Sequence, residues 1–346
     1  MAEKPIFPNV KNSVDDKKTN INFIESINLT NDSFSLYWLK DTFIVFKSVN
    51  DILYLIYSIE KNSIISFNLI KYNKINEIKN AHFMRITSFR HYLDINNKRD
   101  LMISISADDN NLKLWDINNF ELLFNFENIN SEGYMFSGCF LNDNNNIYIV
   151  SSNYKSPSIG GLIKIFDLYG NKIKEINKSK DNVLFIDNYY CKDENTNYII
   201  TGNYGYIKSY NYNQNKLYHK YCDTNKENHF SFIINKKESK TYLIDSGDDG
   251  KIRLWDFHTG DLINIINAIK EQIFDICIFK NRYILAGCID YTIKIIDLEK
   301  GGVDNVLEGH NHRVITIKSF FHPKFGDCII SQGWLNEPIK LWISKI

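Results

Sequence analysis

The sequence of 346 residues predicts an all-β protein built from seven copies of one strand-rich unit. Three observations lead to this prediction. A short pattern of apolar, aromatic and acidic residues returns about every 45 residues. An apolar run and a polar turn precede the copies, and no segment between them has the 3.6-residue periodicity of a helix.

The repeated pattern reads apolar, variable, apolar, aromatic, and then Asp or Asn. Its copies are IISFN (64–68), LKLWD (112–116), IKIFD (163–167), IKSYN (207–211), IRLWD (252–256), IKIID (293–297) and IKLWI (339–343). The fourth positions of successive copies lie 48, 51, 44, 45, 41 and 46 residues apart. Seven copies at such even spacing are typical of a repeat architecture.

The surroundings of the pattern predict the strands of each unit. An apolar run such as DLMISIS, TYLIDSG or RYILAGC comes about ten residues before the pattern, and a polar turn such as GDDGK follows that run. A further alternating segment, such as ELLFNFE or DLINIIN, comes after the pattern. Each unit therefore contains three or four short strands joined by turns. The absence of helical periodicity excludes a parallel sheet made of βαβ units.

Two of these copies end in Trp-Asp, at Trp115-Asp116 and Trp255-Asp256, and Gly309-His310 precedes the last copy. On these residues the chain resembles the WD-repeat β-propeller family, whose repeats begin with Gly-His and end with Trp-Asp. The resemblance covers residues 21–346 and implies a single seven-bladed β-propeller. The expected blades cover residues 34–80, 84–130, 134–180, 183–226, 230–268, 273–309, and 314–346 with 21–29. Residues 1–20 are expected to form a flexible polar tail.

The two ends of the chain are expected to meet in the seventh blade. The last copy stops at its third strand, which leaves that blade one strand short. The segment INFIESINL (21–29) alternates like a strand and precedes the first full unit. We expect it to pair beside residues 339–345, because such closure removes an exposed sheet edge.

The resemblance also implies buried hydrogen-bond networks. In this family a His before the first strand bonds through a Ser or Thr of the second strand to the Trp of the third, and an Asp in the intervening turn orients the His. A His stands 33, 26 and 32 residues before the three Trp copies, whereas the Phe166, Tyr210 and Ile296 copies have none there. A buried indole N–H needs an acceptor, which explains why His and Trp occur together. The predicted networks are His82, Ser104, Asp108 and Trp115; His229, Ser246, Asp249 and Trp255; and His310, Ser331 and Trp342.

Catalytic patterns are missing from the sequence. It contains no GxSxG, HExxH or GxxxxGK[ST] motif. Its six cysteines lie at least eleven residues apart, which excludes a CxxC zinc pattern and favours buried free thiols. The acidic pairs Asp108-Asp109 and Asp248-Asp249 fall in tight turns, where turn capping is favoured over metal binding. We therefore expect no catalytic residue, metal or cofactor. Isolated carboxylates of different blades could still converge on a central channel, so a propeller enzyme stays open as an alternative.

Charge and hydropathy limit the partners further. Forty-one basic residues balance 41 acidic residues, which excludes nucleic-acid binding driven by overall charge. The first residues, MAEKPIFPNV, carry charges and prolines where a signal peptide needs an apolar run, and no apolar stretch approaches the roughly 20 residues that cross a bilayer. We expect a cytoplasmic or nuclear protein that is neither secreted nor bound to a membrane.

Surface recognition remains as the main functional expectation. In the family that the chain resembles, the loops before the first strands and between the second and third strands form one face around the channel mouth. Aromatic and Arg side chains dominate binding hot spots. The candidate face collects Arg85, Tyr154, Tyr204, Tyr206, Tyr291, Arg313 and Trp334. Tyr154 opens the insertion NYKSPSIGG (153–161), which is either a binding loop or surface padding.

The expected function is therefore that of a non-enzymatic scaffold which docks peptides or domains of other proteins. We expect the propeller itself to be monomeric within its complexes. Besides the propeller enzyme, a structural subunit of a large permanent complex remains an alternative.

Overall fold

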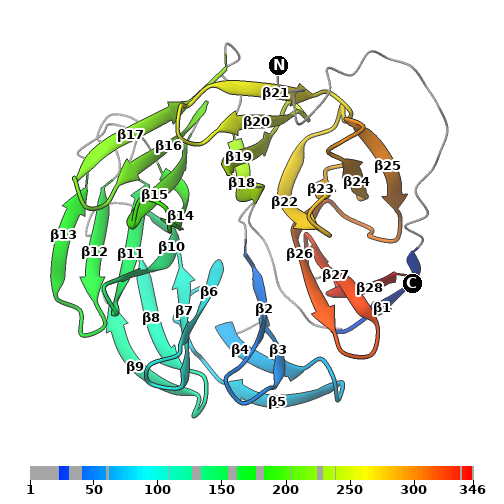
Figure 1. Cartoon of the computed structure of the whole chain (residues 1–346). Coiled ribbons are helices and arrows are strands. Elements are labelled where there is room, and N and C mark those ends of the chain that lie inside the picture. The colour runs from blue at the N-terminus through cyan, green and yellow to red at the C-terminus, as the bar shows by residue number, and fades with distance from the viewer. Residues whose placement is uncertain are drawn as a thin grey trace.

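The computed structural model of the chain describes residues 23–30, 41–59, 62–108, 110–126, 134–154, 162–176, 183–203, 205–223, 229–237, 239–335 and 337–344. These residues form 28 β-strands, which pair into seven four-stranded antiparallel sheets. The sheets stand side by side around a central axis (Figure 1). The chain is an all-β, seven-bladed β-propeller, so the predicted fold class is confirmed.

Blades 1 to 4 follow one another along the chain, and in each the strands pair in sequence order. Blade 1 contains β2 (Phe43–Lys47), β3 (Leu53–Ile59), β4 (Ser63–Asn68) and β5 (Asn73–Ile78). Blade 2 contains β6 (Ser88–Asp94), β7 (Arg99–Ser106), β8 (Asn111–Asp116) and β9 (Glu121–Phe126). Blade 3 contains β10 (Tyr134–Asp143), β11 (Asn146–Tyr154), β12 (Ile163–Asp167) and β13 (Lys172–Ile176). Blade 4 contains β14 (Val183–Cys191), β15 (Thr196–Asn203), β16 (Tyr206–Asn211) and β17 (Lys216–Tyr221).

Blades 5 to 7 complete the ring. Blade 5 contains β18 (His229–Lys237), β19 (Lys240–Gly247), β20 (Ile252–Asp256) and β21 (Leu262–Ile266). Blade 6 contains β22 (Ile273–Phe279), β23 (Tyr283–Cys288), β24 (Ile293–Asp297) and β25 (Gly302–Leu307). Blade 7 contains β26 (Val314–His322), β27 (Gly326–Gly333), β28 (Lys340–Ser344) and β1 (Phe23–Asn28). The expected polar tail, residues 1–20, lies outside the described residues.

Strand β1 closes the ring. It runs antiparallel to β28, with Ile27 opposite Leu341. Beyond the strand, the Leu29 amide donates to the Ile339 carbonyl at 2.8 Å, and the Ile339 amide donates to the Thr30 hydroxyl at 3.0 Å. The prediction that the N-terminal segment completes the last blade is therefore confirmed.

The repeated pattern forms the third strand of every blade, and its fourth residue packs toward the preceding blade. Trp115 lies in the core cluster between blades 1 and 2, and Trp342 lies in the cluster between blades 6 and 7. In six blades the pairing of the third and fourth strands shifts register immediately before this fourth residue. Such bulges increase the right-handed twist of a strand, which suits the strongly twisted blades.

The hydrophobic core is divided into seven clusters, one between each pair of neighbouring blades. Ile244 of blade 5, for example, packs with Ile276 and Ile296 of blade 6. Because a blade is covered on both faces, its middle strands are nearly continuous apolar runs rather than alternating ones. The residues that one blade buries lie against its neighbours, so each unit depends on the ring for its core.

Hydrogen bonds join the innermost strands around the channel. The Ser231 hydroxyl of β18 donates to Asp275 of β22 at 2.8 Å, and the other oxygen of Asp275 accepts the Ile317 amide of β26 at 3.0 Å. Between blades 7 and 1, the hydroxyls of Thr316 and Thr42 lie 2.9 Å apart. These bonds tie the inner strands of neighbouring blades to one another.

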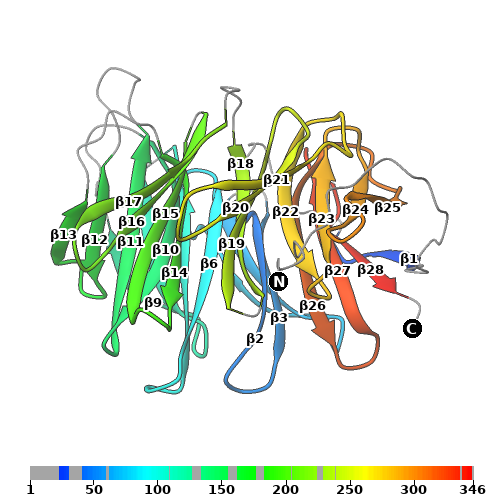
Figure 2. The same ribbon diagram turned by 45° about the horizontal axis from the view of Figure 1, so that its top comes forward.

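The two faces of the ring carry different loops. The hairpins between first and second strands, such as β2–β3 and β26–β27, project together at the lower side of Figure 2. The described residues of the loops before the first strands and between the second and third strands lie at the opposite end (Figure 2), which we call the upper face.

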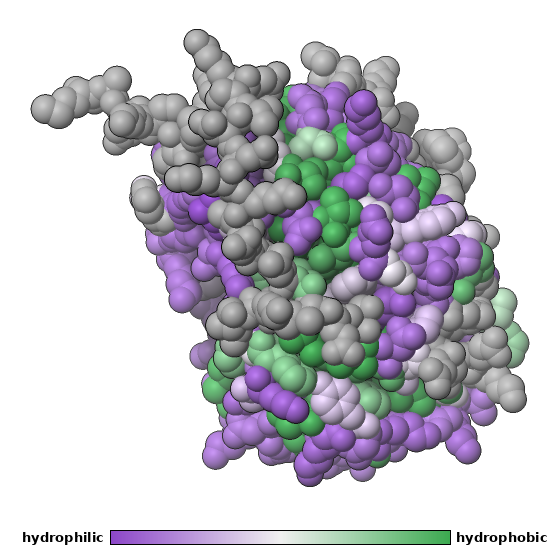
Figure 3. Space-filling view, turned by 90° about the vertical axis from the view of Figure 1, so that its right-hand side faces the viewer, coloured by the Kyte–Doolittle hydropathy of each residue, from purple (hydrophilic) through white to green (hydrophobic). Residues whose placement is uncertain are grey.

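The outer strands are half apolar and half polar. Exposed aliphatic side chains occur on them, among them Leu122 of β9, Ile173 of β13, Leu217 of β17 and Val306 of β25. The side of the molecule that includes β25 accordingly shows hydrophobic and hydrophilic residues interspersed (Figure 3).

Candidate protein-interaction face

A buried chain of hydrogen-bonded side chains lies behind the upper face of blade 7. Trp342 of β28 donates from Nε1 to the Ser331 hydroxyl of β27 at 2.7 Å, and His310 Nε2 lies 2.7 Å from the same hydroxyl. His310 Nδ1 lies 2.7 Å from Glu337 Oε2, and Glu337 Oε1 accepts the Asn311 amide. The structure brings together the three residues predicted for this blade and adds Glu337, which the sequence reasoning missed.

One arrangement of protons satisfies every member of this chain. An ionised carboxylate only accepts, so His310 donates from Nδ1 to Glu337 and accepts at Nε2 from Ser331, whose oxygen receives the indole N–H. Burial lowers the pKa of His310 although Glu337 opposes the shift, which favours the neutral ring. Burial alone would raise the pKa of Glu337, but the hydrogen bonds from His310 and the Asn311 amide outweigh it and lower the pKa. Gly333 makes room for the carboxylate, because a Cβ there would lie 1.8 Å from Glu337 Oε2.

The network of blade 2 has the predicted centre but not the predicted acid. His82 Nε2 lies 2.7 Å from the Ser104 hydroxyl of β7, and Trp115 Nε1 of β8 donates to that hydroxyl at 2.8 Å. The Asp108 carboxylate instead receives Arg85 at 3.1 Å, while His82 Nδ1 is buried without a hydrogen-bond partner among the described residues. The prediction that Asp108 orients His82 is therefore wrong. Burial, with a smaller effect of a neighbouring lysine, lowers the pKa of His82 to about 3.

In blade 5 a carboxylate replaces the bridging hydroxyl. His229 Nδ1 lies 2.9 Å from one oxygen of Asp245, and Trp255 Nε1 donates to the other oxygen at 2.5 Å. The Ser246 hydroxyl is buried and has no hydrogen-bond partner within the described part of the chain. The prediction of Ser246 as the bridge is therefore wrong, and Asp245 is the residue that links His229 to Trp255.

Arg253 compensates the buried charge of Asp245. Its guanidinium is fully buried, lies 3.7 Å from Asp245, donates to Asp223 at 2.7 Å and forms an ion pair with Asp249. Burial alone would lower the pKa of Arg253, but Asp249 and Asp245 raise it. A buried carboxylate needs such a partner, because an uncompensated charge away from water is costly. Asp249 therefore binds Arg253, and its predicted role beside His229 is wrong.

The length of the hairpin between the second and third strands explains why Ser246, and not Asp245, was predicted as the bridging residue of blade 5. The bridging residue pairs across the sheet with a basic residue that lies two positions before the Trp. These pairs are Ser104–Lys113, Ser331–Lys340 and Asp245–Arg253. The two partners are nine residues apart in the first two pairs and eight apart in the third. Counting back from the basic partner along this shorter hairpin would have identified Asp245 from the sequence.

Five side chains of blades 6 and 7 gather on the upper face. We call Phe274, Tyr291, His312, Arg313 and Trp334 the mouth cluster. The Arg313 guanidinium carbon lies 3.8 Å from the centre of the Trp334 ring and 5.6 Å from that of Phe274. The His312 ring stands edge-on to Tyr291 at 6.0 Å and to Trp334 at 6.5 Å. The Trp334 amide also donates to the Arg313 carbonyl at 3.0 Å, which ties the two loops of blade 7 together.

Exposure varies across the mouth cluster. Phe274 is 4% exposed and Tyr291 is 48% exposed, with the other three members half-buried between them. Burial lowers the pKa of Arg313, although Tyr291 opposes the shift. The guanidinium remains charged and is held over an aromatic face, which stabilises a partly desolvated cation. His312 is half-buried in this cluster.

The remaining residues of the candidate face lie elsewhere. Arg85 pairs with Asp108 on blade 2. The Tyr206 ring of blade 4 lies under the ammonium groups of Lys208 and Lys220, at 5.0 and 4.1 Å. Tyr204 and the Tyr154 side chain lie outside the described residues. The structure thus joins Tyr291, Arg313 and Trp334 into one cluster and leaves Arg85 and Tyr206 apart from it.

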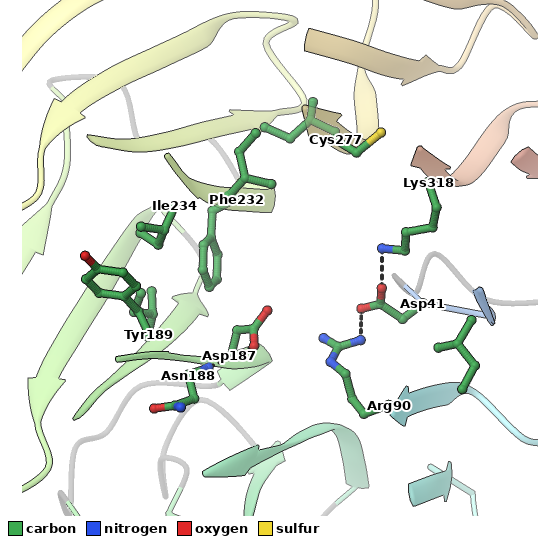
Figure 4. Close-up of a pocket in the computed structure, with 13 residues that line it drawn as sticks. Asp41, Arg90, Asp187, Asn188, Tyr189, Phe232, Ile234, Cys277 and Lys318 are labelled. Carbon is green, nitrogen blue, oxygen red and sulfur yellow. Dashed lines mark hydrogen bonds and ion pairs between the residues drawn. The ribbon is translucent and has the colours of Figure 1, made fainter. Parts of the chain in front are cut away.

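The central channel contains a cavity of about 520 Å³. Asp41, Arg90 and Lys318 lie on one side of it, and Asp187 lies among mostly apolar side chains on the other (Figure 4). Asp41 forms ion pairs with both Arg90 of β6 and Lys318 of β26, as Figure 4 shows. Lys318 also lies 3.8 Å from Asp275. Burial alone would lower the pKa of Lys318, but Asp41 and Asp275 raise it, so the ammonium stays charged. Carboxylates of several blades do converge on the channel, and two of them, Asp41 and Asp275, contact the same lysine.

The fold and this face define the class of protein. It is a seven-bladed β-propeller with His-to-Trp hydrogen-bond networks within blades 2, 5 and 7 and a cation–aromatic cluster on its upper face. Comparison of the sequence with models of known protein families gives no match, and no curated protein matches it. The described residues contain no helix with the length and apolarity needed to cross a membrane.

Proposed function

We propose that the protein is a non-enzymatic interaction scaffold of the WD-repeat type and that it binds partner proteins at the mouth cluster. The His–Ser–Trp connections of blades 2 and 7 support the WD-repeat assignment, because they are the connections that the resemblance implies. The His–Asp–Trp connection of blade 5 is a variant of the same arrangement.

The observation that carries the proposal is the stack of Arg313 on Trp334. Arg and Trp are enriched among the residues that dominate protein–protein interfaces. Both side chains are held in place before any partner arrives, by the 3.8 Å stack and by the hydrogen bond between their backbones. Preformed anchors lower the entropic cost of binding, since little remains to be ordered.

The chemistry of the mouth cluster suggests what the partner presents. A guanidinium donates to carboxylate and carbonyl oxygens, often through two hydrogen bonds at once. The exposed Tyr291 ring offers an apolar surface with a hydroxyl. We therefore propose a peptide or loop that combines an acidic or carbonyl group with an apolar side chain.

The test is the double variant Arg313→Ala with Trp334→Ala. We expect it to lose the main co-purifying partner in affinity purification with mass spectrometry, while circular dichroism shows the fold intact. The identified partner is then titrated against the purified variant. Binding at the affinity of the unmodified protein would contradict the proposal.

A matched control exists on the opposite face of the same blade. Lys324 lies over the Phe325 ring at 5.0 Å, in the β26–β27 hairpin. Lys324→Ala with Phe325→Ala removes the same kind of cation–aromatic pair from the lower face. We expect this control variant to keep the partner. If the control variant loses the partner and the Arg313→Ala, Trp334→Ala variant keeps it, the interface lies on the lower face instead.

The propeller enzyme remains an alternative proposal and would place its chemistry in the channel. There the ion pairs of Asp41 with Arg90 and Lys318 favour an electrostatic connection between blades over acid–base work. A permanent structural subunit is the other alternative. It predicts that the partner stays bound through dilution and prolonged washing, whereas a docking scaffold exchanges its partners.

A further inference from the structure

Three side chains with metal-binding atoms converge where blades 4 and 5 meet. They are Cys191, Glu194 and His258, and one donor atom from each lies within 4.8 Å of the other two. His258 Nδ1 and Glu194 Oε1 are 3.1 Å apart. Cys191 is buried, whereas Glu194 is exposed and His258 is half-buried, so the cluster opens to solvent on one side.

Local structure places these donors. Cys191 ends β14 and pairs with Thr196 of β15, so Glu194 lies in the turn of that hairpin, three residues beyond the thiol. His258 follows β20 of the next blade, in a turn whose amides donate to Asp256 at 2.9 and 3.0 Å. Two donors separated by two residues in a hairpin, with a third from another element, is a spacing typical of zinc sites.

Neighbouring side chains orient the donors from behind. Tyr198 donates to Glu194 Oε2, which leaves Oε1 directed toward His258. His219 Nε2 donates to the His258 carbonyl at 2.6 Å and holds the turn against β17. Hydrogen bonds such as those from Tyr198 and His219, to the groups that carry the donors, are a regular feature of metal sites. The Tyr218 hydroxyl lies 3.3 Å from His258 Nδ1, the nitrogen that faces Glu194, so this contact gives way when that nitrogen binds an ion.

Thiolate, imidazole and carboxylate together favour zinc. Calcium and magnesium prefer oxygen donors alone, whereas zinc accepts sulfur, nitrogen and oxygen in a tetrahedral arrangement. Bond lengths of about 2.3 Å to sulfur and about 2.0 Å to nitrogen or oxygen place tetrahedral donors roughly 3 to 4 Å apart. The 3.1 Å between His258 Nδ1 and Glu194 Oε1 already lies in that range. The Cys191 sulfur lies within 4.8 Å of the other two donor atoms, so those distances would shorten by no more than about 1 Å when the ion binds.

We propose that Cys191, Glu194 and His258 bind a zinc ion that links blade 4 to blade 5. The thiol releases its proton when it binds, and the ion replaces the contact between Glu194 and His258. Three protein donors leave a fourth position for water on the exposed side. The proposal is independent of the mouth cluster, which is built from blades 6 and 7.

The experiment uses the full chain, stripped with a chelator and then titrated with Zn²⁺ and, as a spectroscopic probe, with Co²⁺. We expect one ion per chain, a rise in the melting temperature with Zn²⁺, and the thiolate-to-cobalt charge-transfer band of a tetrahedral sulfur-bound site. Cys191→Ser should abolish that band, and Cys191→Ser and His258→Asn should each weaken Zn²⁺ binding by at least about ten-fold. His258 is half-buried, so its variant tests the site even if the buried cysteine does not tolerate replacement.

The matched control is Cys222→Ser, because Cys222 is the exposed cysteine among the described thiols. It should keep the band and the affinity. Absence of the charge-transfer band in the unmodified protein would overturn the proposal. The same conclusion follows if the band disappears in Cys222→Ser, or if Zn²⁺ binds equally well to Cys191→Ser and His258→Asn.

Discussion

At the scale of single residues, the three networks differ in how completely their buried polar atoms are satisfied. In blade 7 both ring nitrogens of His310 have partners. In blades 2 and 5 one ring nitrogen of His82 and one of His229 has none among the described residues. The acid at the end of the chain therefore decides whether the histidine is fully bonded, and Glu337 supplies it in blade 7.

This difference leads to a prediction for His310. His310→Ala removes a partner from Ser331 and from the buried Glu337 carboxylate, so we expect a loss of roughly 1 to 3 kcal/mol in the free energy of unfolding. His312→Ala, two residues away, should cost no more than about 0.5 kcal/mol, because it changes a partly exposed side chain. Urea unfolding of both variants measures the two losses, and equal losses would contradict the network.

The lowered pKa of His82 gives a prediction for pH. The folded state holds the pKa near 3, whereas an unfolded histidine titrates near 6.5. Between these values the unfolded chain binds the extra proton, so the contribution of His82 is fully present above pH 6.5 and falls as the pH drops toward 3. The slope reaches up to about 1.4 kcal/mol per pH unit. His82→Gln should therefore lose less stability between pH 7 and pH 5 than the unmodified protein does, as measured by urea midpoints; parallel curves would refute this assignment.

At the scale of elements, the short strand β1 covers the open edge of blade 7 and so closes the ring. Its pairing with β28 covers the edge of blade 7, and Phe23 packs against Phe279 of blade 6 with ring centres 6.0 Å apart. A strand edge left open pairs readily with other chains.

Truncation tests this role. Removal of residues 1–18 should be tolerated, because the segment is polar and precedes the strand. Removal of residues 1–30 should lower the melting temperature and cause aggregation, since it takes away β1 and the Thr30 contact with Ile339. Light scattering and thermal melts follow both effects. A monomeric 31–346 chain with unchanged melting would show that the closure contributes nothing.

Elements were predicted from the sequence far better than the contacts between them. The even spacing of the pattern was sufficient to predict seven blades, and the strand-like segment before the first unit was sufficient to predict the closure. Hairpin length was the weak point, because a difference of one residue moved the bridge of blade 5 from Ser246 to Asp245. The sequence did not predict Glu337, because this residue follows the second strand of the blade and reaches His310 only through the folding of the loop after Gly333.

At the scale of the whole molecule, sites arise where blades meet, and this is what the sequence predicted least. Arg313 and Trp334 were predicted as members of a face, and their stack lies within blade 7. Its continuation to Phe274 depends on how blades 6 and 7 approach each other. His258 follows Glu194 by 64 residues, and only the side-by-side placement of blades 4 and 5 brings them together. A pattern within one repeat carries no information about such neighbours.

The closure also determines how the ring responds to force. Phe23 faces Ser344 at one end of the β1–β28 pair, so β1 begins at the point of blade 7 where β28 ends. A pull on the two chain ends would load that point first and open the hydrogen bonds of the pair one after another, as a zipper opens, rather than all together. Tension would therefore peel β1 from the ring before it strains any other blade. The joint that keeps the propeller closed in solution is the place where a mechanical load would open it.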